Sequence, residues 1–347
     1  MPAGEDHNEA DPAGGSGGRD LAASLEPVLG DACEGRLESI TWFRTDWQRG
    51  GAATGRAAWR DERGTRPALV KMPLHPRELR WLRALGGTTP HVPAFLAGGE
   101  TLGGYDLAWA VTEFLPHGPL ALDWSPRLVE PIAEAIAAFS QAASLHPVAP
   151  LPSEPGWSDL IARSRRKVKE AKLEAAKEWN RLLRECDRRL EAVLEIWRAR
   201  SPVEWIHGDL HPGNAMSRRP IDAADPVTEQ VTEPVTEQVP EPVTRPVEVC
   251  LIDFAEVRAG HWVEDAVYLE RLNWSRPERL DGHPPVRSIA RARKAAGLDN
   301  GEDHARLAAI RRLLMAAGAP AYAQTEGTPA HLAACRARIE SSLGMLR

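Results

Sequence analysis

Two short stretches of this chain carry the side chains best suited to chemistry. Residues 207–214 read His-Gly-Asp-Leu-His-Pro-Gly-Asn, and residues 251–254 read Leu-Ile-Asp-Phe. They supply a carboxylate and an amide in the first stretch and a second carboxylate in the later one, each beside an apolar run that predicts a short strand. Phosphoryl transfer needs positioning and charge neutralisation more than covalent help. The two stretches therefore predict a phosphoryl-transfer site.

Each residue type suits one task in such a site. We expect Asp209 to hold the acceptor hydroxyl and take its proton, and Asn214 and Asp253 to offer Mg²⁺ one neutral and one charged oxygen. Mg²⁺ takes few protein oxygens and completes its shell with water and phosphate. We expect His207 to hold the loop shape rather than to carry a proton. An ordinary Asn/Asp-rich turn would explain the first stretch but would leave the second carboxylate unexplained.

Strand patterns come first in the chain and helix patterns follow. Residues 36–60 predict a β-hairpin around Arg49-Gly50-Gly51, residues 68–71 a strand ending in Lys71, residues 77–85 a helix, and residues 107–115 a strand. Later periodicities predict helices over 127–145, 160–199, 262–273, 285–297, 303–317 and 329–345. This order predicts an α+β fold.

Composition suggests where the domains begin and end. We expect a disordered, Gly-rich tail over 1–22, a nucleotide-binding N-terminal lobe over 23–116 and a helical catalytic lobe over 117–347. Residues 226–246 repeat a Val-Thr-Glu unit with frequent prolines, which neither a sheet nor a helix accommodates. They predict a disordered insert over 220–247. A partner-binding role for it is the alternative.

The overall composition is that of a soluble globular protein. The 347 residues are 43% hydrophobic and 27% charged, with a net charge of −6 that argues against nucleic-acid binding. No signal sequence and no long apolar run is visible, so we expect a cytoplasmic protein without a membrane partner. Four scattered cysteines predict reduced thiols. The sequence leaves the oligomeric state open.

With these motifs and this order of elements, the chain resembles the aminoglycoside phosphotransferase family, relatives of choline kinase within the protein-kinase-like fold. The resemblance rests on residues 207–214 and 251–254, with a looser match at 260–265. It implies a bilobal fold with a small N-terminal antiparallel β-sheet lobe and a larger, mainly helical C-terminal lobe. It also implies transfer of phosphate from ATP or GTP, with Mg²⁺, to a hydroxyl of a small molecule.

The resemblance assigns roles to single residues. Asp209 would be the catalytic base, and Asn214 and Asp253 the metal ligands. Lys71 would contact the α and β phosphates, and Glu78 would pair with it, although two prolines lie in the seven residues between them.

Further roles follow for the nucleotide and the C-terminal part. Glu113 and Leu115 would read the adenine edge through their main-chain atoms, and the hairpin at residues 49–51 would cover the phosphates. Asp265, which ends the 260–265 segment, would cap a helix.

The identity of the acceptor is left open: it could be an aminoglycoside, another antibiotic, a choline-like or amino-alcohol metabolite, or a sugar. Glu256, Glu264 and Glu270 could give its site a negative lining suited to a cationic amine. Trp262 and Trp274 would pack in the core or line the acceptor pocket. A catalytically silent kinase-like module that binds nucleotide or a protein partner is the alternative from another class. The grouping of Lys71 with the two motifs favours the enzyme.

Overall fold

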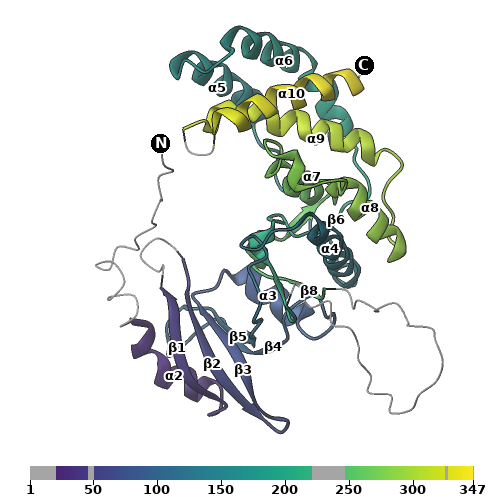
Figure 1. The fold of residues 1–347 in the computed structure, drawn as a ribbon. Coiled ribbons are helices and arrows are strands. Elements are labelled where there is room, and N and C mark those ends of the chain that lie inside the picture. Colours follow the sequence, from purple (N-terminus) through teal and green to yellow (C-terminus); the bar gives the residue numbers. More distant parts are fainter. Residues whose placement is uncertain (1–20, 46–50, 221–246, 325–326, 347) are drawn as a thin grey trace, which may run out of the picture. The chain divides into compact units, whose positions relative to one another are not determined.

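The computed structural model describes residues 21–45, 51–220, 247–324 and 327–346 (Figure 1). They divide into two compact units. The first comprises the described residues within Met1–Thr88 together with Val92–Leu115, and the second comprises Thr89–His91 and the described chain from Pro116 onward. The predicted tail, apart from its last two residues, nearly all of the predicted insert, and the Arg49-Gly50 part of the predicted hairpin lie outside the described residues.

The first unit is built on one antiparallel sheet of five strands in the order β1-β2-β3-β5-β4. Their bounds are β1 (Leu37–Thr45), β2 (Ala53–Asp61), β3 (Gly64–Met72), β4 (Phe95–Gly99) and β5 (Trp109–Glu113). Helix α2 (Glu26–Ala32) packs along β1, and α3 (Pro76–Leu85) contacts β4 (Figure 1). Apolar side chains of α2 and of the sheet share one core, in which Leu29 and Val70 are fully buried.

Local sequence explains how the functional elements of this unit begin and end. The predicted helix is present as α3. His75 caps it by accepting a hydrogen bond from the Arg77 N–H at 3.2 Å, and Pro76 takes the first helical position, where no N–H is needed. Along β2 every second residue is buried, as expected for a strand with one face on the core. Strand β3 carries Lys71 near its end, next to α3 in the chain.

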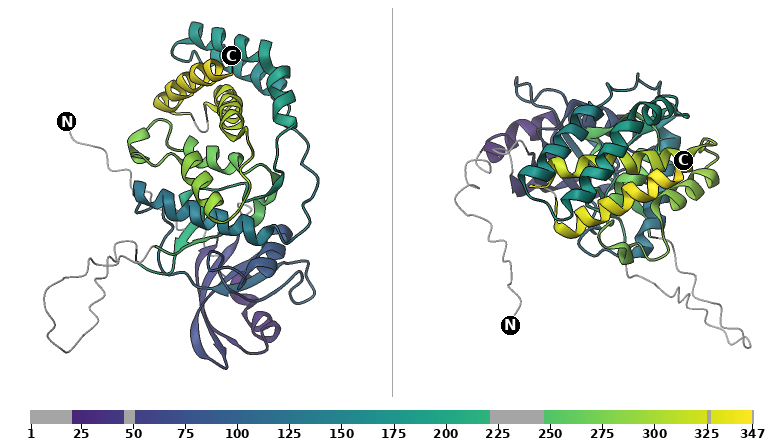
Figure 2. Two further views of the ribbon diagram at one scale, coloured as in Figure 1. Left: turned by 90° about the vertical axis from the view of Figure 1, so that its right-hand side faces the viewer. Right: turned by 90° about the horizontal axis from the view of Figure 1, so that it is seen from above.

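The second unit is mainly helical. Its helices are α4 (Val129–Ala143), α5 (Trp157–Glu170), α6 (Ala176–Arg198), α7 (Val263–Arg271), α8 (Pro285–Ala295), α9 (His304–Gly318) and α10 (Pro329–Met345). Four short strands form two ladders: β6 (Glu204–Ile206) pairs with β9 (Arg258–Gly260), and β7 (Ala215–Ser217) with β8 (Val249–Leu251). Helices α5, α6, α9 and α10 pack against one another and gather at one end of this unit (Figure 2).

The single helix predicted over 160–199 is wrong, because the structure has two helices there. The chain turns between α5 and α6 with Lys172 and Ala175 at positive φ, 48° and 56°. No Gly or Pro marks this turn in the sequence. The turn lets the apolar faces of the two helices, with Val168 and Trp179 fully buried, pack against each other and against α9. Tertiary packing therefore outweighs local helix propensity at this position.

Two further features bear on the sequence predictions. All four cysteines are buried and form no disulfide, as predicted. Among the helices of the described chain, none has both the length and the apolar character that crossing a membrane requires.

Candidate active site

The two strand ladders of the second unit bring the two predicted motifs together. Strand β6 leads into the loop that carries Asp209, and β7 leaves it directly after Asn214, while β8 leads to Asp253. Because β7 pairs with β8, the Ile252 N–H donates to the Asn214 carbonyl oxygen at 3.0 Å. Asp253 is therefore the residue directly after Ile252, whose backbone contacts Asn214.

Asp209 and Asn214 are in direct contact. The Asn214 Nδ2 atom donates to the Asp209 carbonyl oxygen at 3.0 Å and to its Oδ2 at 2.9 Å. These two bonds fix the orientation of the amide, and its Oδ1 atom accepts no hydrogen bond from any described residue. The amide oxygen is thus left for a different partner.

His207 bridges the two motifs as a neutral side chain. It is fully buried, its Nε2 lies 3.0 Å from the Ile252 carbonyl oxygen, and the Asp209 N–H points to its Nδ1 at 3.4 Å. These contacts require the proton on Nε2. Burial lowers the pKa of His207 to about 4, so the ring is uncharged near neutral pH. Its environment matches a structural role.

The expectation that Asp265 caps a helix is wrong. Asp265 lies inside the first turn of α7, which has no side-chain cap. Its two carboxylate oxygens instead accept hydrogen bonds from the backbone N–H groups of His207 and Gly208, both at 2.8 Å. Burial raises the pKa of Asp265 to about 6, while these N–H groups favour its charged form. The carboxylate therefore anchors the start of the Asp209 loop.

Gly208 and Asp253 both adopt left-handed backbone conformations. Gly208 has φ +82°, and a Cβ atom there would lie 2.2 Å from the Glu256 carbonyl oxygen. Asp253 has φ 63° and ψ 68°, a strained conformation for a non-glycine residue, and such strain is concentrated at functional sites. The Phe254 ring holds this turn in place, since it stacks on Phe139 of α4 at 5.8 Å.

Tyr268 and His211 complete the surroundings of Asp209. His211 accepts the Gly213 N–H at Nδ1, which leaves Nε2 to donate to Asp209 Oδ2, 3.5 Å away. The pKa of Asp209 is lowered to about 2, first by His211 and then, against partial burial, by Tyr268 and Asn214. Tyr268 was not predicted from the sequence. Its spacing of three residues from Asp265 on one helix was the available signal.

The first unit holds the remaining predicted residues. Lys71 Nζ donates to both carboxylate oxygens of Glu78, at 2.7 and 2.9 Å, and Glu78 is buried. The predicted ion pair is therefore present. At the end of β5 the Glu113 N–H is bonded to Ala94, whereas the Leu115 N–H has no hydrogen-bond partner in the described part of the chain.

The expected negative lining of an acceptor site is not supported. Glu264 and Glu270 are buried and paired with arginines: Glu264 with Arg258 at 2.9 Å and Glu270 with Arg312 at 2.6 Å. Their charges are thus neutralised within the protein, and only Glu256 is exposed.

The two tryptophans that could have lined an acceptor pocket are core residues. Trp262 and Trp274 are buried, and their indole N–H groups donate to the Asn300 carbonyl oxygen and to Glu270. The alternative of core packing therefore holds for both.

The donor set suits a magnesium ion that is shared with a phosphate ligand. Among the described residues, no group of three or more His, Cys, Asp or Glu side chains is arranged to hold a metal. One amide oxygen and one carboxylate are what Mg²⁺ needs when phosphates and water fill the rest of its shell. The free Oδ1 of Asn214 and the carboxylate of Asp253 fit this pattern.

Comparison with known proteins identifies the fold and the family. The structure is similar to the aminoglycoside phosphotransferase of Alicyclobacillus acidocaldarius subsp. acidocaldarius, with 19% identity, 90% of this chain and 92% of that chain covered, and a TM-score of 0.55. It is also similar to a microcompartment-associated aminopropanol kinase, with 14% identity, 94% and 98% coverage and a TM-score of 0.56. The α+β, protein-kinase-like fold is confirmed.

The sequence match is more specific. Residues 35–225, more than half of the chain, match the sequence profile of the phosphotransferase enzyme family, and the chain belongs to this family. No curated protein sequence matches the chain. The prediction of an enzyme of the small-molecule kinase class is confirmed.

Proposed function

We propose that this protein transfers the γ-phosphate of ATP to a hydroxyl group of a small molecule, with Asp209 as the catalytic base. The observation that carries the proposal is the contact of Asp209 with Asn214, next to the turn that holds Asp253. One carboxylate for the acceptor and two oxygen ligands for a cation are the parts that phosphoryl transfer requires.

Asp209 acts mainly by orientation. With a pKa near 2 its carboxylate is ionised at neutral pH and can accept a hydrogen bond from the acceptor hydroxyl. Such a weak base takes the proton late, as the bond to phosphorus forms and the hydroxyl becomes acidic. His211 and Tyr268 hold the carboxylate in one orientation, and Asp265 fixes the backbone beneath it.

The nucleotide roles proposed here are those that the sequence motifs assign to single residues. Asn214 through Oδ1 and Asp253 through its carboxylate would hold Mg²⁺, which would neutralise charge on the phosphates. Lys71, oriented by Glu78, binds the α and β phosphates, and the main chain at Glu113 and Leu115 binds the base. GTP is the alternative nucleotide. The sequence left several acceptor classes open, and they include the aminoglycosides and amino alcohols named in the similar structures.

Thermal unfolding tests the nucleotide part of the proposal. ATP with Mg²⁺ at a hundredfold excess over its Kd should stabilise the protein by about 3 kcal/mol. Asp253→Asn should remove the Mg²⁺-dependent part of this shift, whereas the exposed Asp106→Asn should keep it. An Asp253→Asn variant that responds to Mg²⁺ and ATP as the wild type does would contradict the metal assignment.

A further inference from the structure

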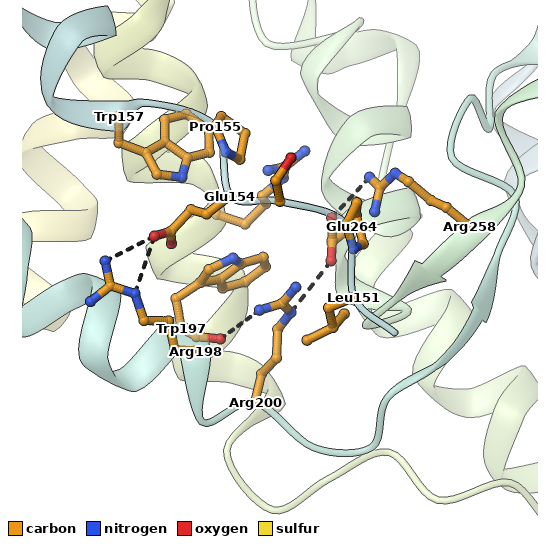
Figure 3. A pocket seen from close by; sticks show the side chains of 12 residues that line it. Leu151, Glu154, Pro155, Trp157, Trp197, Arg198, Arg200, Arg258 and Glu264 are labelled. Carbon is orange, nitrogen blue, oxygen red and sulfur yellow. Dashed lines mark hydrogen bonds and ion pairs between the residues drawn. The ribbon is translucent and has the colours of Figure 1, made fainter. Parts of the chain in front are cut away.

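A cavity of about 440 Å³ lies within the second unit, a volume in the range of small-molecule sites. The loop at residues 151–155, the start of α5, the end of α6 and residues from β9, α7 and α9 line it (Figure 3). Of its lining residues, only Glu264 was singled out from the sequence, as a candidate lining of the acceptor site.

Positive charge exceeds negative charge in this cavity. Four arginines and two glutamates line it. Figure 3 shows both glutamates engaged by arginines: Glu154 accepts from Arg198 at 2.8 Å, and Glu264 accepts from Arg258 at 2.9 Å. Burial alone would raise the pKa of Glu264, but the charges of Arg311, Arg258 and Arg200 lower it, so Glu264 stays ionised. With both glutamates ionised, the lining residues carry two more positive than negative charges, although Arg198 also pairs with Glu191 outside the lining, at 2.7 Å.

Arg311 is the cation that lacks a direct partner. Its guanidinium forms no hydrogen bond and no ion pair within 4.0 Å in the described part of the chain, and its Nε atom is buried without an acceptor. An arginine does not lose its proton in a protein. Its Nε–H is therefore a buried donor on a charged group, and such a donor without an acceptor costs more than the 1–3 kcal/mol of a neutral one.

A second donor without a partner lines the same cavity. The Trp157 side chain is more than nine-tenths buried, and its Nε1–H has no acceptor. Buried donors are normally paired. Arg200 Nε, 3.5 Å from Glu264, is a third buried donor without a hydrogen bond at this cavity. Such donors at one cavity indicate a ligand that brings acceptor atoms.

Aromatic rings form the walls beside these donors. The Arg311 guanidinium lies 5.9 Å from the Trp157 ring centroid and 5.8 Å from that of Trp197, and Arg200 lies 4.6 Å from the Trp197 ring. The rings provide apolar contact, so the cavity suits a ligand with a ring or short carbon skeleton as well as an anionic group.

Helix α7 connects this cavity with Asp209. Glu264, which lines the cavity, and Tyr268, which hydrogen-bonds to Asp209, are four residues apart and therefore on the same face of the helix. Four residues of helix span roughly 6 Å. Arg258, which also lines the cavity, pairs with Ile206, the residue before the Asp209 loop. The cavity lining is therefore linked to the Asp209 loop through α7 and through β9.

We propose that the cavity binds a carboxylate or phosphate group of the acceptor, so that the substrate of this kinase is an anionic hydroxyl compound. The inference rests on the proposed function and names its substrate class. An anionic substrate differs from the cationic amine that the glutamates in the sequence suggested. In the structure, Glu264 and Glu270 are paired with arginines.

Binding of matched probes tests the cavity without any reaction. Phenyl phosphate, benzoate, benzyl alcohol and benzylamine share one ring and differ in charge. The two anions at millimolar concentration should raise the Tm of the full-length protein, and the neutral and cationic probes should not. Absence of stabilisation by either anion, or equal stabilisation by benzylamine, would overturn the proposal.

Substitutions locate the binding. Arg311→Gln should weaken anion binding at least tenfold, and the free protein should stay folded, because the change removes ring contacts and a charge near Glu264 but no hydrogen bond or ion pair. Trp157→Phe keeps the ring and should weaken binding to a smaller extent. Arg188→Gln removes an exposed charge from α6 and should bind anions as the wild type does. A lower Tm of Arg311→Gln with an undiminished anion response would show that Arg311 is a purely structural residue.

Transfer assays separate this inference from the proposed function. With ATP and Mg²⁺, a panel of hydroxylated carboxylates, phosphates, neutral sugars and amines should show transfer mainly to the anionic members, and Arg311→Gln should raise KM for them more than it lowers kcat. Transfer mainly to amines would overturn the inference and leave the proposed function standing. Transfer to no acceptor, together with absent ATP binding, would overturn the proposed function itself.

Discussion

Side chains around Asp209 form two layers of support. His211, Tyr268 and Asn214 contact its carboxylate, and His207 and Asp265 hold the backbone of its loop. The first group sets the direction of the carboxylate and keeps it ionised. The second group ties the loop to Ile252 and to helix α7, so a change there should act through position rather than through charge at the reacting atoms.

Asp265→Asn tests the second layer. In the wild type both carboxylate oxygens accept a backbone N–H. The amide of the variant keeps one acceptor oxygen, but its NH₂ group faces the other N–H, which then has no acceptor. We expect a loss of about 2–3 kcal/mol in the free energy of unfolding and a fall in kcat with little change in the KM for ATP. Denaturant unfolding and steady-state kinetics measure both. Asp187→Asn, at an exposed position of α6, serves as the control. Equal losses of stability and of kcat in the two variants would contradict the anchoring role.

At the residue level, the sequence was most informative where a motif fixes both identity and spacing. Residues 207–214 and the later Ile-Asp-Phe predicted the contact of the two motifs, which the structure shows through the Ile252 N–H and the Asn214 carbonyl oxygen. The Tyr268 contact and the pairing of Glu264 and Glu270 with arginines depend on how α7 packs against distant elements. Charge counting along the chain therefore suggested a negative acceptor site that the structure does not contain.

Among the structural elements, the turn at Gly208 is the most constrained. It links strand β6 to the Asp209 loop and passes so close to Glu256 that a side chain has no room. The ladder of β6 with β9 and that of β7 with β8 fix the two ends of this loop and of the Asp253 turn. These elements are short, and their precision comes from the contacts between them.

Gly208→Ala tests this crowding. Its Cβ would lie 2.2 Å from a carbonyl oxygen, at a φ of +82°. Gly282→Ala is the matched control, because Gly282 has a φ of +77° but no atom within 4 Å of a Cβ. We expect the control to lose about 1 kcal/mol from backbone strain and Gly208→Ala to lose several kcal/mol. Urea unfolding compares the two, and equal losses would show that the clash is relieved by a small shift.

Element order was easier to predict than element boundaries. Amphipathic periodicity indicated α3 and most later helices. It missed α2 and β4, which are short, and it joined α5 and α6. The joined helix has a continuous apolar pattern and no Gly or Pro at the break, so only the packing of Val168 and Trp179 against neighbouring helices explains the turn.

For the whole molecule, buried histidines make stability depend on pH. Burial lowers the pKa values of His207 and His261 to about 4, from about 6.5 in the unfolded chain. The unfolded state therefore binds more protons between pH 6.5 and 4, and the stability that these groups contribute is lost as the pH falls through this window. Asp265 acts in the opposite direction below pH 6, because its pKa is raised in the folded state.

The two histidines outweigh the one aspartate. We expect the free energy of unfolding to fall by roughly 3–4 kcal/mol between pH 6.5 and 4, before other carboxylates contribute. Tm measured across this range checks the prediction. His261→Gln should remove about half of the pH dependence that the two histidines cause. A Tm that stays constant down to pH 4 would contradict the burial of the two histidines in their neutral form.

Phosphate transfer by an Asp209→Asn variant tests the central claim most directly. The measurement is the rate at which the γ-phosphate of ATP reaches a hydroxyl acceptor found in the transfer screen, together with ATP affinity. We predict a loss of at least about 10²-fold in kcat with ATP affinity nearly unchanged, since Asp209 would serve the acceptor and not the nucleotide. Transfer by this variant at the wild-type rate would contradict the account.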